Sequence, residues 1–232
     1  MIILSQPGFK SFITYVFGFI FVTLFIYLGI PFFFDYKNYE SAIEKKILNN
    51  FGLHLNITSR AKYNIFPSPR LNLKDVEILS FPNGSKNIGQ INKLILKIPF
   101  KKLVNLKKID FDAVELIDVA FNIEASEIIN LKNFLNNITH EKPIKLKKGK
   151  INFLDKANLL FTVDLDKLNI SGKNYSNKVD LKGRIFNTKL KIHYQNRNPN
   201  ENPLSNIAIG LPEIGLNIKL NLNTDKKNKK KY

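Results

Sequence analysis

The chain has 232 residues, no cysteine and a formal net charge of +17 at pH 7. The absence of cysteine excludes disulfides, cysteine-ligated zinc and thiol nucleophiles. The positive charge suits an anionic partner such as lipid headgroups, a membrane surface or nucleic acid, but lysine supplies nearly all of it. Because phosphate recognition favours the planar arginine fork, we interpret most of this charge as solvated surface and predict no nucleic-acid partner. The only arginines are Arg60, Arg70, Arg184 and Arg197.

An uncharged apolar run from Ser11 to Phe34 predicts a transmembrane anchor over residues 11–34. As a helix this run would be about 36 Å long, enough to cross a hydrocarbon layer of about 30 Å. A cleaved secretion signal would have a shorter apolar core and small residues at its cleavage point, and a buried helix of a soluble protein would show a polar face. We therefore expect a retained, single-pass anchor. More basic residues follow the run than precede it, which mildly favours a cytoplasmic body without settling the orientation.

Two short helices are predicted after the anchor. Residues 39–51 place Tyr39, Ile43 and Ile47 on one face, and Gly52 can take the left-handed conformation that ends a helix. Residues 126–137 begin at Ser126, which can cap the first helical turn.

From His54 onward apolar and polar residues alternate, which predicts roughly ten β-strands. The two short helices present too little apolar surface to cover so many strands, and each large aliphatic side chain left in water forfeits about 1.5–3 kcal/mol. The sheet must therefore curl so that its apolar face meets itself, as in a sandwich or barrel, or it must hold an apolar ligand. Periodicity alone favours the self-covered sandwich.

The segment from Phe34 to Leu79 resembles the start of the AsmA family. In that family an anchor is followed by an aspartate and a tyrosine, a short helix, a glycine, a strand, an F-P-x-P element and a strand of the form L-x-L-x-D-V-x-I. Residues 91–123 are similar to the family's strand pair, and a repeated unit begins again at Ile144. The matching motif positions are Asp35, Tyr36, Gly52, Phe66, Pro67, Pro69, Leu71, Leu73, Asp75, Val76 and Ile78.

The AsmA family is similar to the bridge-like lipid transfer proteins, so the resemblance implies a β-rich α+β fold. We expect an N-terminal transmembrane helix, then a curved antiparallel sheet forming an apolar groove, with two short helices. Residues 1–10 would be a cytoplasmic tail and residues 35–195 an AsmA-like groove domain in the periplasm. Residues 196–232 would add a strand and a basic tail, which either protects the last strand or marks a truncated member. The location implied is the inner membrane of a Gram-negative cell.

The resemblance further implies that the groove binds or conducts phospholipid acyl chains between the inner and outer membranes, in envelope biogenesis and without a cofactor. The expected partners are membrane lipids and envelope proteins. An alternative is a non-catalytic assembly or scaffolding factor for outer-membrane proteins, whose trough receives a partner strand. The candidate lipid-binding residues are Leu94, Leu96, Ile98, Phe111, Phe153, Phe161, Val163 and Leu165.

Catalytic chemistry is not expected. His54, His140 and His193 lie far apart in the sequence without metal-ligand spacing. There is also no G-x-S-x-G motif and no phosphate-cradling glycine loop. We predict that the chain is not an enzyme and holds no metal.

Overall fold

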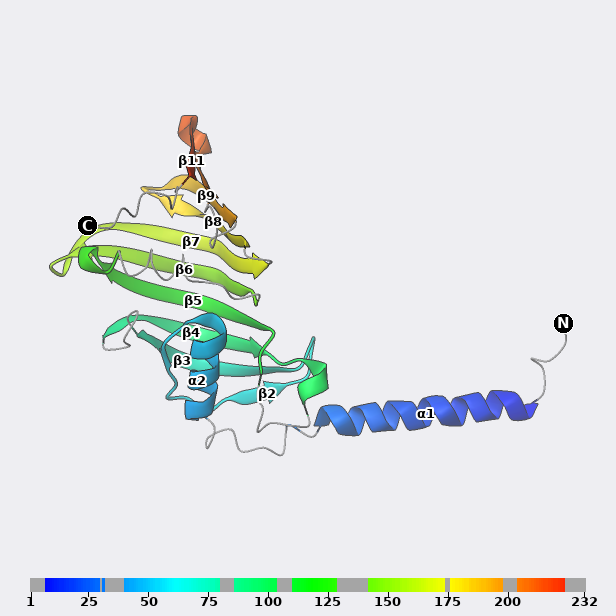
Figure 1. Cartoon of the computed structure of the whole chain (residues 1–232). Coiled ribbons are helices and arrows are strands. Elements are labelled where there is room, and N and C mark those ends of the chain that lie inside the picture. Colours follow the sequence, from blue (N-terminus) through cyan, green and yellow to red (C-terminus); the bar gives the residue numbers. More distant parts are fainter. Residues whose placement is uncertain are drawn as a thin grey trace, which may run out of the picture.

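The computed structural model describes residues 7–29, 31, 40–79, 86–103, 110–128, 142–173, 176–197 and 204–223. These residues form a long apolar helix, a second short helix and one large β-sheet (Figure 1). The predicted β-rich architecture behind an N-terminal apolar helix is therefore confirmed.

Helix α1 (Pro7–Gly29) is long and apolar enough to span a membrane, from Ser11 onward. It extends away from the sheet (Figure 1), and most of its large apolar side chains are exposed. The helix ends shortly before Pro31, whose ring disfavours helical geometry in the residue before it. The predicted anchor extended to Phe34, and its residues 32–34 lie outside the described residues.

Helix α2 (Glu40–Phe51) matches the first predicted short helix. Ile43, Ile47 and Phe51 are fully buried and join the same core cluster as the first strands of the sheet. Gly52 has φ of 64° and donates its N–H to the Leu48 carbonyl at 2.8 Å, so it ends the helix as predicted. The second predicted helix begins with the 3₁₀ turn η5 (Ala125–Glu127), and residues 129–137 lie outside the described residues.

The described strands form a single 11-stranded sheet in the order β1-β3-β4-β5-β6-β7-β8-β9-β10-β11, with β2 also paired to β3. The part of the chain that the structure describes contains no second sheet, so it is not the sandwich that periodicity favoured. The strands are β1 (Leu55–Asn56), β2 (Lys62–Asn64), β3 (Arg70–Leu79), β4 (Asn87–Lys97), β5 (Ala113–Glu124), β6 (Ile144–Asp155), β7 (Asn158–Lys173), β8 (Ser176–Ile185), β9 (Thr188–Arg197), β10 (Leu204–Leu211) and β11 (Leu216–Asn223).

The prediction of a wholly antiparallel sheet is wrong at one place, because β5 and β6 are parallel. Parallel neighbours require a connection long enough to carry the chain back to the same end of the sheet. The connection over residues 125–143 meets this requirement, whereas β6 and β7 are joined by a tight turn at Lys156 and Ala157. The sheet is therefore mixed. It is also strongly twisted, so that β11 is seen nearly edge-on when β3 is seen face-on (Figure 1).

The strict alternation of inward and outward residues breaks at the same level in five neighbouring strands, β3 to β7. In each, a pair of residues separates two inward positions; in β3 the exposed Lys74 and Asp75 lie between the buried Leu73 and Val76. Positive φ angles at Asp75, Asp118 and Lys148 mark the break. Because the breaks are in register, no strand turns its apolar residues outward relative to its neighbours.

Candidate functional site

One face of the sheet is aliphatic from β3 to β11, and we call it the apolar face. Directly opposed residues of neighbouring strands share a face, so the strand register traces it. One row, which we call the aliphatic row, has a leucine or isoleucine on each of nine successive strands, over about 38 Å at the usual strand spacing. Its members are Leu73, Leu94, Leu116, Leu146, Leu168, Leu181, Ile192, Ile209 and Ile218.

The side chains of the aliphatic row become more exposed toward β11. Leu73 and Leu94 are fully buried, the members on β7 to β10 are half-buried, and Ile218 is 40% exposed. On the same strand and face, Leu216 and Leu220 are also exposed. The protein's own core therefore encloses the first strands, whereas the last strands present aliphatic surface. A groove for an apolar ligand would have to form along this second part.

The opposite face is polar and carries a row of lysines. On the level next to the aliphatic row, exposed lysines occupy six of the seven strands from β3 to β9: Lys74, Lys93, Lys147, Lys167, Lys182 and Lys191. Like charges directly opposed across strands are destabilising, but exposed charges are screened by solvent and salt, and Lys147 also pairs with Glu115 at 2.7 Å. Part of the chain's positive charge is thus a solvated sheet face.

A shallow hollow of about 520 Å³ lies beside β8, β9 and β10, where the small residues Ala208 and Gly210 leave space. Most of its wall belongs to the polar face, including Asp180 and His193, whose Oδ1 and Nδ1 atoms lie 2.7 Å apart. The Asp180 carboxyl group has a lowered pKa, because hydrogen bonds from His193 and Lys178 outweigh the opposing effect of burial. The hollow therefore opens mainly on the face opposite the aliphatic row, with charged side chains in its wall.

The predicted lipid-binding residues lie in or beside the sheet. Phe153 and Phe161 are half-buried on the apolar face, and their rings stack with centroids 4.6 Å apart. Phe111 precedes β5 and is fully buried near α2. The other candidates are buried in the protein's own core: Leu94, Leu96, Ile98, Val163 and Leu165.

The candidate lipid-binding residues did not include three exposed residues of the apolar face on β11, Leu216, Ile218 and Leu220. The alternation of apolar residues with other residues over positions 214–222 was the sequence signal that could have identified them. Strand β10, which lies between β9 and β11, was not predicted at all. Without β10, the sequence could not show that the apolar residues of β11 share a face with those of β9.

The motif positions of the resemblance have local structural roles. Phe66, Pro67 and Pro69 lie in the connection between β2 and β3, and Leu71, Leu73, Val76 and Ile78 are the buried residues of β3. Asp75 occupies the break in that strand with φ of 52°. Asp35 and Tyr36 lie outside the described residues.

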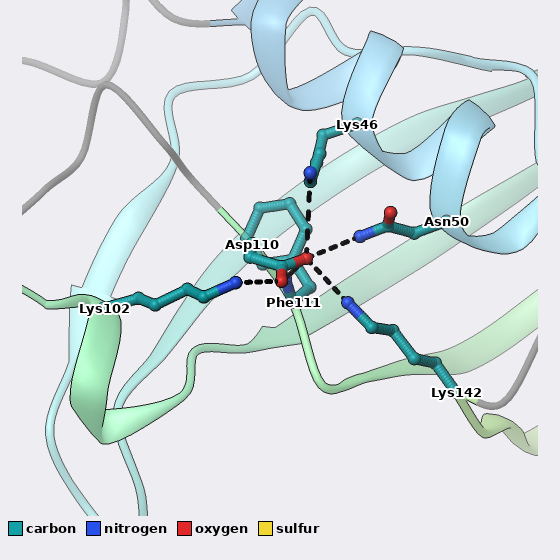
Figure 2. A network of polar contacts seen from close by, with 6 residues as sticks. All are labelled: Lys46, Asn50, Lys102, Asp110, Phe111 and Lys142. Carbon is teal, nitrogen blue, oxygen red and sulfur yellow. Dashed lines mark hydrogen bonds and ion pairs between the residues drawn. The ribbon is translucent and has the colours of Figure 1, made fainter.

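The carboxylate of Asp110 joins α2 to two connections of the sheet, the one between β4 and β5 and the one between β5 and β6 (Figure 2). It accepts hydrogen bonds from Asn50 of α2 at 2.8 Å, from Lys102 at 2.5 Å and from Lys142 at 2.6 Å. Lys46 of α2 lies 3.9 Å away. Burial alone would raise the pKa of Asp110, but the hydrogen bonds from Lys102, Lys142 and Asn50 hold it well below its usual range. The cluster fixes the helix that covers the first strands.

The histidines form no site in the described part of the chain. His54 precedes β1, His193 lies on β9, and His140 is outside the described residues. Among the residues that the structure describes, no three histidine, aspartate or glutamate side chains gather where they could hold a metal. No family model matches the chain, and a search of curated proteins gave no match.

Proposed function

We propose that this chain is an AsmA-like, membrane-anchored protein that binds phospholipid acyl chains on its apolar face. In this proposal α1 crosses the inner membrane of a Gram-negative cell and the sheet lies in the periplasm. Acyl chains would move along the apolar face between the inner and outer membranes, in the upkeep of the envelope. The observation that carries the proposal is the aliphatic row, which is buried at β3 and exposed at β11.

Acyl chains match the chemistry of this face. Removing apolar surface from water is worth about 25 cal/mol per Å², and an acyl chain lying on β7 to β11 would shelter the half-buried and exposed members of the row. The ligand needs no polar partner there, because both neighbouring rows of side chains on the face are also largely aliphatic. The phosphate headgroup would remain in water.

The test is to purify the full chain in mild detergent and to measure co-purifying phospholipid by mass spectrometry. The variant Ile218→Asp should lower the affinity for phospholipid about tenfold or more, since a charge against hydrocarbon costs over 1.4 kcal/mol. Ile218 is already 40% exposed, so the fold should tolerate the change.

Asn217→Asp is the matched control, because it adds the same charge to the opposite face of the same exposed strand. It should leave lipid occupancy unchanged. Equal lipid occupancy in both variants, or a loss in both, would contradict lipid binding on the apolar face.

A scaffolding role for outer-membrane proteins is the second candidate, and the edge strand β11 favours it. In the described part of the chain β11 pairs only with β10, so its outer edge could accept a client strand by β-addition. Such a scaffold should carry no stoichiometric phospholipid, so the same mass-spectrometric measurement separates the two functions.

A further inference from the structure

Two exposed aromatic side chains lie at the end of the sheet next to α1. Phe66, in the connection between β2 and β3, is 83% exposed. Phe100 is 52% exposed and opens the 3₁₀ turn η3 (Phe100–Lys102) that follows β4. The two connections adjoin, because the Ile98 N–H donates to the Pro69 carbonyl at 2.9 Å.

The last turn of α1 is hydrogen-bonded to η3 and to β2, the strand that precedes the connection with Phe66. The Tyr27 hydroxyl donates to the Phe100 carbonyl at 2.6 Å, and the Tyr63 hydroxyl of β2 donates to the Leu28 carbonyl at 3.3 Å. Burial, with a smaller contribution from Tyr27, raises the pKa of Tyr63 to about 12, so this phenol remains a donor at physiological pH. The turn η3 lies directly beside the end of α1 (Figure 1, the short green helical turn).

Two lysines lie next to Phe100 in the turn η3. Lys101 and Lys102 of η3 are both exposed. Lys102 pairs with Asp110, whereas Lys101 has no ion-pair partner among the described residues. Beside the end of a membrane-spanning helix, exposed phenylalanine rings can enter the boundary between headgroups and hydrocarbon, and neighbouring lysines can meet anionic lipid.

We infer that Phe66, Phe100 and Lys101 form a docking surface that rests on anionic phospholipid in the same bilayer that holds α1. This inference uses the anchor of the proposed function, but it does not use the apolar face. Its consequence is a fixed orientation of the first strands: the ends of β3 and β4 next to Phe100 lie at the membrane, and the opposite ends of these strands point away from it.

Phe186 provides a matched control for this surface. It is 77% exposed and lies in the turn between β8 and β9. Strand pairing places the start of β8, and not this turn, at the same end as Phe100. A strand as long as β8 spans about 33 Å, so Phe186 should stay in water while Phe100 contacts lipid.

The experiment uses the full chain, which has no native cysteine. Phe66→Cys, Phe100→Cys and Phe186→Cys are each labelled with an environment-sensitive fluorophore and reconstituted in vesicles of phosphatidylcholine and phosphatidylglycerol. Labels at positions 66 and 100 should emit blue-shifted light that a lipid-borne quencher reduces severalfold, and the label at 186 should not. Adding Lys101→Glu, or omitting phosphatidylglycerol, should weaken quenching at 100.

Aqueous emission at 66 and 100, or equal quenching at 186, would overturn the inference. A blue shift that the lipid-borne quencher leaves unchanged would also overturn it, because a protein would then cover the surface. Carbonate extraction of the same vesicles reports the anchor: a released chain refutes the anchoring on which both proposals rest. Ile218→Asp should leave quenching at 66 and 100 unchanged, so failure of lipid binding on the apolar face is distinguishable from failure of docking.

Discussion

At the scale of single residues, the sheet depends on a few positions where the backbone of one strand approaches the next very closely. A Cβ atom placed on Gly183 of β8 would lie 2.1 Å from the Asp164 carbonyl oxygen of β7. The register between these strands shifts beside it, between Leu165 and Lys167. Only glycine lets the two backbones approach this closely. Gly183 therefore allows β8 to pair with β7, the last of the five strands that carry the break.

We expect Gly183→Ala to destabilise the folded chain by about 1–3 kcal/mol, the usual cost of overpacking. The measurement is the urea midpoint of the detergent-solubilised chain. Gly210→Ala is the control, because nothing lies within 4 Å of the added atom, and it should be neutral or slightly stabilising. Equal midpoints for Gly183→Ala and the unsubstituted chain would contradict the close approach.

At the scale of elements, α2 covers the start of the apolar face and is held there by two kinds of interaction. Its buried residues pack on the first strands, and its half-buried Lys46 and Asn50 reach Asp110 (Figure 2). The helix itself could be predicted because its apolar residues recur at helical spacing. The Asp110 cluster could not be, since its members are brought together from α2, η3 and the segments before β5 and β6 only by the folded sheet.

The lowered pKa of Asp110 gives this cluster a definite pH dependence. Its stabilisation is fully present above the ordinary aspartate pKa of about 3.9 and is lost as the pH falls below that value toward the lower folded-state pKa. Asp110→Asn should therefore cost about 1.5–3 kcal/mol at pH 7 and less at pH 3.

Urea midpoints between pH 7 and pH 3 check this dependence. Asp112→Asn is the control, because the Asp112 side chain is exposed and its removal should shift the midpoint little at any pH. A constant difference between Asp110→Asn and the unsubstituted chain across this range would show that the carboxylate does not stabilise the native state.

At the scale of the whole molecule, the described chain is an asymmetric sheet on a long apolar helix. Its first strands are closed by the protein's own core, and its last strands present both an aliphatic face and an unpaired edge. The increase in exposed aliphatic surface from the first strands to β11 is the feature on which the proposed functions depend. Acyl chains on the face and a client strand on the edge are the two uses proposed above.

The proposed orientation can be tested on the whole molecule in cells. If the sheet is periplasmic, protease added to spheroplasts should degrade it almost completely while a cytoplasmic marker stays intact. Detergent should make both proteins sensitive. A sheet that survives until detergent is added would place it in the cytoplasm, as the simple count of flanking basic residues mildly favours.

Local patterns in the sequence were sufficient for much of the fold. The apolar helix, α2 with Gly52 at its end and most of the strands follow from periods of 3.6 and two residues, which depend only on the geometry of one segment. The paired breaks in β3 to β7 are visible in the sequence as gaps between Leu73 and Val76 or Leu165 and Leu168, but their common level was not predicted. A gap in one strand cannot reveal that its neighbours break at the same level.

The sequence by itself thus determined that one long helix is apolar on all sides and that many strands have one aliphatic face, because each is a property of a single segment. Only the tertiary structure decided that β5 and β6 are parallel, that Leu94 and Leu96 are enclosed whereas Ile218 is exposed, and that Asp110 meets Lys142. These facts depend on which segments become neighbours, and neighbours are chosen by the burial and pairing of the whole sheet.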